Sequence, residues 1–234
     1  MIELKDVTKT YLKQTAVKDL TIGFPSGKII GLLGENGSGK STVLKMIAGL
    51  VRPSAGSVLL NGDPASRQSC RQVAYLSELD TYYPFYTVSQ TIHFYASQFS
   101  DFDVDKAFDI LSFMKLTPDQ KVKNLSKGSR GRLKIVLALS RDVPVILMDE
   151  PLSGLDPMVR ETVIKGLLSF VDIETQTVII TTHEIGEIEP LLDEAAILHK
   201  GNLINQQSID SIREEGLTLT EWMKRTYSTG AAVK

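Results

Sequence analysis

Short apolar segments alternate with amphipathic ones along most of this 234-residue chain. Apolar side chains at Leu20, Ile22 and Phe24 alternate with other residues, which predicts a strand, and Pro25-Ser26-Gly27 then predicts a turn. Continuous apolar runs predict further buried strands, at 29–33, 143–148, 177–181 and 194–198. A second turn, of the hairpin kind, is predicted at Asn61-Gly62-Asp63. This alternation indicates an α/β fold.

Helical periodicity appears first after the 29–33 run, where Val43, Leu44 and Ile47 share one face of a helix that begins at Ser41 and ends near Gly49. Three helical patterns then follow one another without a clear strand, at about 88–98, 103–115 and 127–140. We expect a single domain over residues 1–234, with this helical part inserted at about 80–140. A C-terminal helical extension that carries Trp222 is predicted at about 208–234.

The composition is that of an ordinary globular protein, with 42% hydrophobic and 23% charged residues. The net charge of −2 shows no basic excess, so we expect no nucleic-acid partner. The single cysteine, Cys70, cannot form an internal disulfide, and the apolar runs are far shorter than the ~20 residues of a membrane span. The N-terminus lacks the pattern of a signal peptide, so we expect a cytoplasmic protein that reaches a membrane only through a partner.

A complete phosphate-binding pattern follows the 29–33 run. The segment reads Gly34-Glu35-Asn36-Gly37-Ser38-Gly39-Lys40-Ser41 and continues into Thr42. Its glycines let the backbone curl with N–H groups pointing inward, and the helix that follows adds partial positive charge. We expect Lys40 to reach the β- and γ-phosphates of ATP and Ser41 to ligate Mg²⁺. A glycine-rich turn with a chance lysine is the alternative, and the flanking strand and helix count against it.

Two carboxylates end the run at 143–148. Asp149 is placed to hold Mg²⁺, and Glu150 to orient and activate the attacking water. Phosphoryl transfer depends mainly on positioning and electrostatic stabilisation, so a metal-holding acid beside a water-positioning acid suits it. Taken alone, the pair would equally fit a solvated strand end.

With the segments described next, these motifs resemble the nucleotide-binding subunit of ABC transporters over essentially the whole chain. That family carries a Leu-Ser-Gly-Gly-Gln signature, and the matching stretch here reads Leu125-Ser126-Lys127-Gly128-Ser129. The resemblance implies that Ser126 and Gly128 contact the γ-phosphate of ATP held by the opposite subunit. Ser126 would equally serve as a helix N-cap. Lys127 and Ser129 depart from the pattern, and Lys127 either contacts phosphate or points to solvent.

The resemblance assigns further residues. Pro151-Leu152-Ser153-Gly154-Leu155-Asp156 resembles the D-loop, which crosses the dimer interface, and otherwise reads as a turn in which Asp156 is an N-cap. His183 occupies the position of the family's switch histidine, which contacts the γ-phosphate.

The resemblance also assigns residues on either side of the nucleotide. Tyr11 occupies the position where the family stacks an aromatic ring on adenine, although tyrosines more often serve packing. Glu78 replaces the usual glutamine near the metal. The aromatic cluster of residues 82–86 either receives the membrane subunit or folds back on its own core.

The resemblance also implies an architecture and a function. It implies a P-loop NTPase (RecA-like) core with an N-terminal antiparallel β subdomain and an inserted α-helical subdomain. It further implies an ATPase that uses ATP and Mg²⁺, pairs as a homodimer or heterodimer, and drives a separate transmembrane permease from the inner face of the cell membrane. The Lys-Gly variant of the signature, Glu78 and the short C-terminus resemble bacterial exporters of peptides or antibiotics.

Other functions fit less well. An importer subunit often carries an added regulatory domain after the core. A soluble ABC-type ATPase acting on ribosomes or DNA usually has two ATPase halves or a long coiled-coil insertion. A P-loop GTPase would need an Asn-Lys-x-Asp motif, which this chain lacks. A small-molecule kinase would not need the signature or the D-loop.

Overall fold

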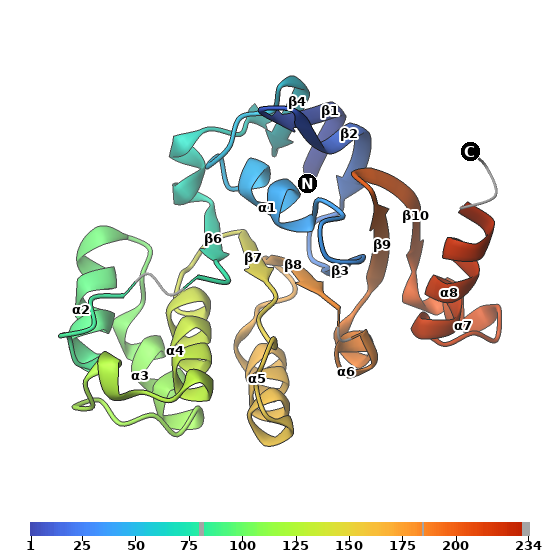
Figure 1. Ribbon diagram of the computed structural model, residues 1–234. Helices are drawn as coiled ribbons and strands as arrows, with labels where there is room; N and C mark the ends of the chain where they lie inside the picture. Colours follow the sequence, from blue (N-terminus) through green and yellow to red (C-terminus); the bar gives the residue numbers. More distant parts are fainter. Residues whose placement is uncertain (80–81, 184, 231–234) are drawn as a thin grey trace.

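The computed structural model describes residues 1–79, 82–183 and 185–230, which form two β-sheets and the helices around them (Figure 1). The smaller sheet is antiparallel, with strand order β2-β1-β4-β5. Its strands are β1 (Ile2–Tyr11), β2 (Gln14–Phe24), β4 (Ala55–Leu60) and β5 (Asp63–Pro64). The predicted turn at Asn61-Gly62 joins β4 to β5, and both of its residues take positive φ, as a tight hairpin requires.

The larger sheet has the strand order β10-β9-β3-β8-β7-β6 and is parallel except at β10. Its strands are β3 (Ile29–Leu33), β6 (Val73–Leu76), β7 (Val145–Asp149), β8 (Thr177–Thr182), β9 (Glu194–His199) and β10 (Asn202–Ser208). The predicted strands are therefore present, and β7 begins two residues later than expected because Pro144 precedes it. The α/β expectation is confirmed.

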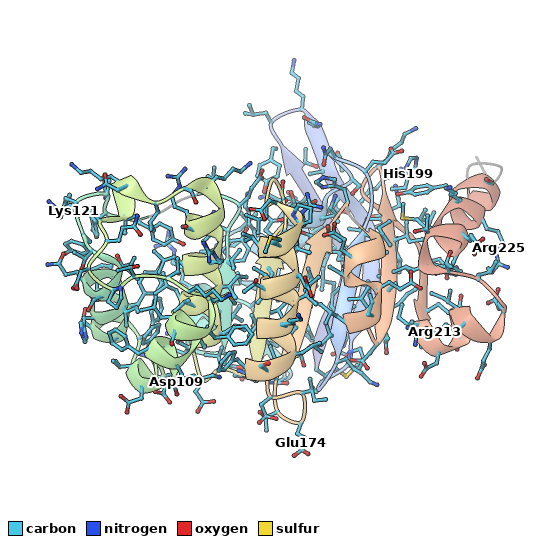
Figure 2. All side chains as sticks on the ribbon, turned by 90° about the horizontal axis from the view of Figure 1, so that it is seen from below. Asp109, Lys121, Glu174, His199, Arg213 and Arg225 are labelled. Carbon is cyan, nitrogen blue, oxygen red and sulfur yellow. The ribbon has the colours of Figure 1, made fainter. Side chains whose placement is uncertain are left out.

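Both faces of the larger sheet are buried, which is why its strands are continuously apolar. One face packs against α1 (Lys40–Ile47) and the smaller sheet, and contributes Leu32, Leu147 and Ile179 to that core. The other face packs against the remaining helices, among them α5 (Pro157–Phe170) and α6 (Ile185–Ile188). Seen from below, α5 and α6 lie between the helical region and the C-terminal helices (Figure 2).

The helical region contains α2 (Val88–Gln98), α3 (Val104–Phe113) and α4 (Lys127–Leu139). Each helix starts at a side-chain cap. Thr87 and Gln90 form a capping box on α2, and Asp103 and Ser126 cap α3 and α4. Short 3₁₀ turns lie at Arg67–Arg71, Val122–Asn124 and Glu189–Leu191.

The C-terminal extension divides into α7 (Ile209–Glu214) and α8 (Leu219–Gly230). Sequence periodicity predicted helix throughout, whereas Gly216 takes a positive φ between the two helices and turns the chain. Trp222 on α8 is fully buried, and its indole N–H donates to the Gln207 side chain of β10 at 2.8 Å. This contact fixes α8 to the edge of the larger sheet.

Candidate active site

The phosphate loop lies at the carboxyl edge of the parallel strands, where β3 runs into α1. Gly34 and Gly39 take φ of 150° and 106°, and any side chain there would collide with the backbone oxygens of Leu198 and Ala16. Only glycine therefore lets this loop curl so tightly. The Gly201 N–H donates to the Ser38 carbonyl at 3.0 Å, which holds the loop from the side of β10.

Lys40 is buried at the base of the loop. Its Nζ donates to the carbonyls of Gly34 at 2.7 Å and Glu35 at 3.1 Å. Burial lowers the pKa of Lys40, while the charges of Glu150 and Asp149 act in the opposite direction. The ammonium thus lies where two carboxylates and the loop converge, and backbone carbonyls hold it there.

Asp149 is buried and accepts hydrogen bonds at both carboxylate oxygens. Its Oδ1 accepts from Ser41 Oγ and from Thr181 Oγ1, each at 2.9 Å. Its Oδ2 accepts from the Tyr75 hydroxyl at 3.2 Å. The pKa of Tyr75 is raised, mainly by burial and then by the negative charge of Asp149. The Ser41–Asp149 pair offers hydroxyl and carboxylate oxygens, the donors that Mg²⁺ prefers beside phosphate and water. These residues fit the ion that the sequence predicted.

Glu150 follows β7 in a left-handed backbone conformation, with φ of 50°. Its N–H donates to Thr181 Oγ1 at 2.9 Å, which fixes the turn. One oxygen of its carboxylate lies 3.7 Å from Lys40 Nζ, and the other lies 2.9 Å from Nδ1 of His183. The carboxylate is only 12% exposed. Lys40 on one side and His183 on the other hold it over the phosphate loop.

One pocket gathers most of the predicted site residues. It is lined by Tyr11, Asn36, Gly37, Ser38, Gly39, Lys40, Ser41, Thr42, Glu78, Glu150 and His183, together with Gln14, Ala16 and Ser153. Tyr11 at the end of β1 is 43% exposed and stands at the rim, as an adenine-stacking ring would. Glu78 lies in the segment after β6, where its backbone carbonyl accepts from Lys134 Nζ at 2.5 Å.

Six predicted residues do not line this pocket in the part of the chain that the structure describes. Gly34, Glu35 and Asp149 still adjoin it through hydrogen bonds with Lys40 and Ser41. The other three are Ser126, Gly128 and Asp156. They lie together elsewhere. Ser126 caps α4 by accepting from the Ser129 N–H at 3.1 Å, and Asp156 caps α5 by accepting from the Val159 N–H at 3.1 Å. The Gly128 backbone approaches Val159 and the Asp156 side chain. The capping roles of Ser126 and Asp156 are therefore real, and both residues are exposed.

The two departures from the signature have local contacts. The Lys127 ammonium packs over Gly154 of the D-loop so closely that a methyl group at Gly154 would collide with it. The hydroxyl of Ser129 pairs with that of Ser126 at 3.0 Å and with Arg132 at 3.1 Å. Lys127 thus joins the start of α4 to the D-loop.

The aromatic cluster of residues 82–86 packs in part on its own helical region. Tyr83 packs edge-on against Phe94 of α2, with ring centroids 5.3 Å apart. Phe85 remains 63% exposed. The cluster is therefore anchored on its own helix and still offers an apolar surface.

Sequence reasoning missed two residues of the site, Thr181 and Tyr75. Both contact Asp149, and Thr181 also holds the backbone of Glu150. Their signal lies in strand register, since Thr181 pairs with Asp149 across β8 and β7. A polar residue at the end of an apolar run beside an acid-ended strand is the feature that would have identified Thr181.

Comparisons with known proteins agree with this geometry. A family model described as ABC transporter matches residues 17–153. The chain is 34% identical over 211 residues to the Nod factor export ATP-binding protein I of Burkholderia orbicola, covering 87% of this chain and 69% of that protein. No described helix has the length and apolar character of a membrane span.

Two solved structures share the fold. A structure of an ATP-binding subunit of an ABC transporter has a TM-score of 0.86 and 26% identity, and covers 97% of this chain and 99% of that one. The ATP-binding cassette MJ0796, solved as a dimer in a post-hydrolysis state with ADP and Pi, has a TM-score of 0.80 and 23% identity, with 89% and 99% of the two chains covered.

Proposed function

Because the chain belongs to the ABC transporter family, as one of its ATP-binding and ATP-hydrolysing subunits, we propose that two such subunits close head to tail around ATP and drive a separate transmembrane subunit. The observation that carries this proposal is the division of the site within one chain. The phosphate loop, Glu150 and His183 share a pocket that Ser126 and Gly128 do not line. A second subunit would bring its own Ser126 and Gly128 to the open side.

In this arrangement each residue has a separate task. Lys40 and the loop N–H groups bind the β- and γ-phosphates, and Tyr11 stacks on adenine. Ser41 and Asp149 would hold Mg²⁺, which supplies charge neutralisation at the phosphate oxygens. Glu150 accepts the proton of the attacking water, and His183, already 2.9 Å from Glu150, orients that carboxylate toward the γ-phosphate. The partner's Ser126 hydroxyl and the start of α4 then complete the phosphate contacts.

Closure and reopening of the dimer would transmit the energy of ATP to the membrane. ATP bridges the two subunits only while its γ-phosphate is present, so hydrolysis favours the open state. The dimeric MJ0796 cassette supports a paired arrangement for this fold. We propose a homodimer or a heterodimer with a related subunit, seated at the inner face of the cell membrane, with no nucleic acid involved.

We further propose that the transmembrane subunit is a bacterial exporter of peptides or antibiotics. An export protein is among the relatives at 34% identity, which favours export. The exposed Phe85 of the aromatic cluster supports docking of an apolar partner segment. The alternatives are an importer subunit and a soluble ABC-type ATPase acting on another macromolecular complex.

The dimer can be tested with Glu150→Gln, which blocks hydrolysis and should accumulate the closed state. We expect this variant to be monomeric in EDTA and dimeric with ATP by light scattering. Adding Ser126→Asp should abolish the ATP-dependent dimer, because a carboxylate would face the γ-phosphate. Ser126→Asn is the matched control, since both residues are good N-caps and only aspartate carries the charge.

If the Asp and Asn variants dimerise equally well, Ser126 does not face phosphate and the sandwich is wrong. If no variant dimerises alone, each variant is mixed with membrane extract to test for a heterodimeric partner. The Ser126→Asp and Ser126→Asn variants are then compared in the same way.

A further inference from the structure

Strand register places Tyr75 beside the carboxylate that ends β7. Tyr75 pairs with Leu147 in the parallel β6–β7 ladder, and Asp149 lies two residues further along the same strand. Side chains two residues apart share one face of a sheet, so Tyr75, Leu147 and Asp149 all point toward α1. Helix α1 begins at Lys40 and presents Ser41 to the same carboxylate.

The hydroxyl of Tyr75 completes the hydrogen bonding of Asp149. Ser41 and Thr181 both donate to Oδ1, whereas Oδ2 accepts the Tyr75 hydroxyl at 3.2 Å. Without Tyr75, the carboxylate would be held at one oxygen and could turn about its Cβ–Cγ bond. A donor at each oxygen fixes the plane of the group and so the direction in which its lone pairs face a metal ion.

A packing role alone does not explain this tyrosine. The strand β6 is the edge of the sheet, and the Tyr75 ring lines an apolar groove with Leu76, Tyr95 and Leu137. Phenylalanine would fill that groove equally well. The ring is half-buried at the groove, yet its hydroxyl points away from solvent to the buried Asp149.

We propose that Tyr75 is a positioning residue for the metal site, which sets the orientation of the Asp149 carboxylate through its hydroxyl. This inference rests on the proposed function in one respect, namely that Asp149 faces Mg²⁺. Tyr75 lies on β6, outside both the phosphate loop and the strand that ends in Asp149, so neither motif includes it.

The test compares nucleotide affinity with and without the ion. Binding of a fluorescent ATP analogue is titrated in Mg²⁺ and in EDTA, and the ratio of the two affinities reports the contact between protein and metal. For Tyr75→Phe we expect an unchanged affinity in EDTA and a ratio reduced about 10-fold, as for the loss of an outer hydrogen bond to a metal ligand. The EDTA affinity also shows that the variant is folded.

Two further variants make each outcome decisive. Tyr95→Phe removes a hydroxyl from another wall of the same groove and should keep the wild-type ratio. Asp149→Asn should lower the ratio at least as far as Tyr75→Phe does. If Asp149→Asn lowers the ratio and Tyr75→Phe leaves it at the wild-type value, the role of Tyr75 is wrong. If Asp149→Asn itself leaves the ratio unchanged, the proposed metal role of Asp149 fails instead.

Discussion

At the scale of single residues, Glu150 lies between Lys40 and His183, which fixes the carboxylate that we propose activates the attacking water. Glu150→Gln should slow ATP hydrolysis by on the order of 10²–10⁴, because the amide cannot accept the proton of the water. Binding of a fluorescent ATP analogue should persist, and phosphate release measures the rate. Glu161→Gln, an exposed change on α5, is the control. A wild-type rate for Glu150→Gln would refute the assigned role.

We expect a change at Lys40, by contrast, to act first on nucleotide binding. Its ammonium is buried and donates to two carbonyls of the loop, which places its positive charge inside the phosphate loop. Lys40→Ala should weaken ATP binding roughly 10- to 100-fold, the range expected for one charge-assisted contact. Lys165→Ala removes an exposed ammonium of similar size and should bind ATP normally. Equal affinities in a titration would count against the phosphate loop.

The residues that sequence alone identified are those whose chemistry is local in the chain. Lys40 and Ser41 belong to one continuous motif, and Asp149 and Glu150 end one apolar run. Tyr75 and Thr181 could not be identified in this way, because each reaches Asp149 only through the register of β6, β7 and β8. A one-residue shift of register would turn either side chain to the opposite face of the sheet.

At the scale of elements, an ion pair formed by Arg141, just after α4, links the helical region to the core. Arg141 donates from Nε and Nη2 to Asp101, and Nη2 also donates to the Cys70 carbonyl at 2.7 Å. Its guanidinium lies 3.8 Å from the ring centre of Phe99. The pair therefore joins the α2–α3 connection to the segment before β6.

Breaking this pair should destabilise the fold. Arg141→Leu leaves the Asp101 carboxylate, which is 21% exposed, without its partner, and we expect a loss of about 3 kcal/mol in the free energy of unfolding. Urea denaturation measures the change. Arg213→Leu breaks a solvent-exposed pair with Asp210 and should have little effect. A loss below about 0.5 kcal/mol for Arg141→Leu, the range of ordinary surface changes, would show that the pair does not fasten the region.

The positions of the elements were more predictable than their ends. Apolar periodicity located β3, α2 and α4 within a few residues, because each buries one continuous stripe or run. It did not locate the break between α7 and α8, since Gly216 lies in an otherwise helical pattern and turns the chain through its positive φ. Nor did local patterning indicate that Lys127 would pack over Gly154, a contact between the start of α4 and a turn distant in sequence.

At the scale of the whole molecule, the residues that we propose as the two halves of an ATP site lie on different surfaces of one chain. The pocket around the phosphate loop and the exposed start of α4 both offer N–H and hydroxyl donors suited to phosphate. A dimer would unite them, and the exposed aromatic cluster would remain available to a membrane partner. In the proposed transporter, that partner would decide the transported substrate.

Recovery of the tagged chain from detergent-solubilised native membranes, followed by mass spectrometry of the bound proteins, tests this account most directly. We predict a multi-spanning membrane protein in stoichiometric amount, retained after high-salt washing. An untagged chain, expressed at the same level, controls for adsorption. Recovery of only soluble proteins or ribosomes would contradict the transport role, while leaving the ATPase chemistry intact.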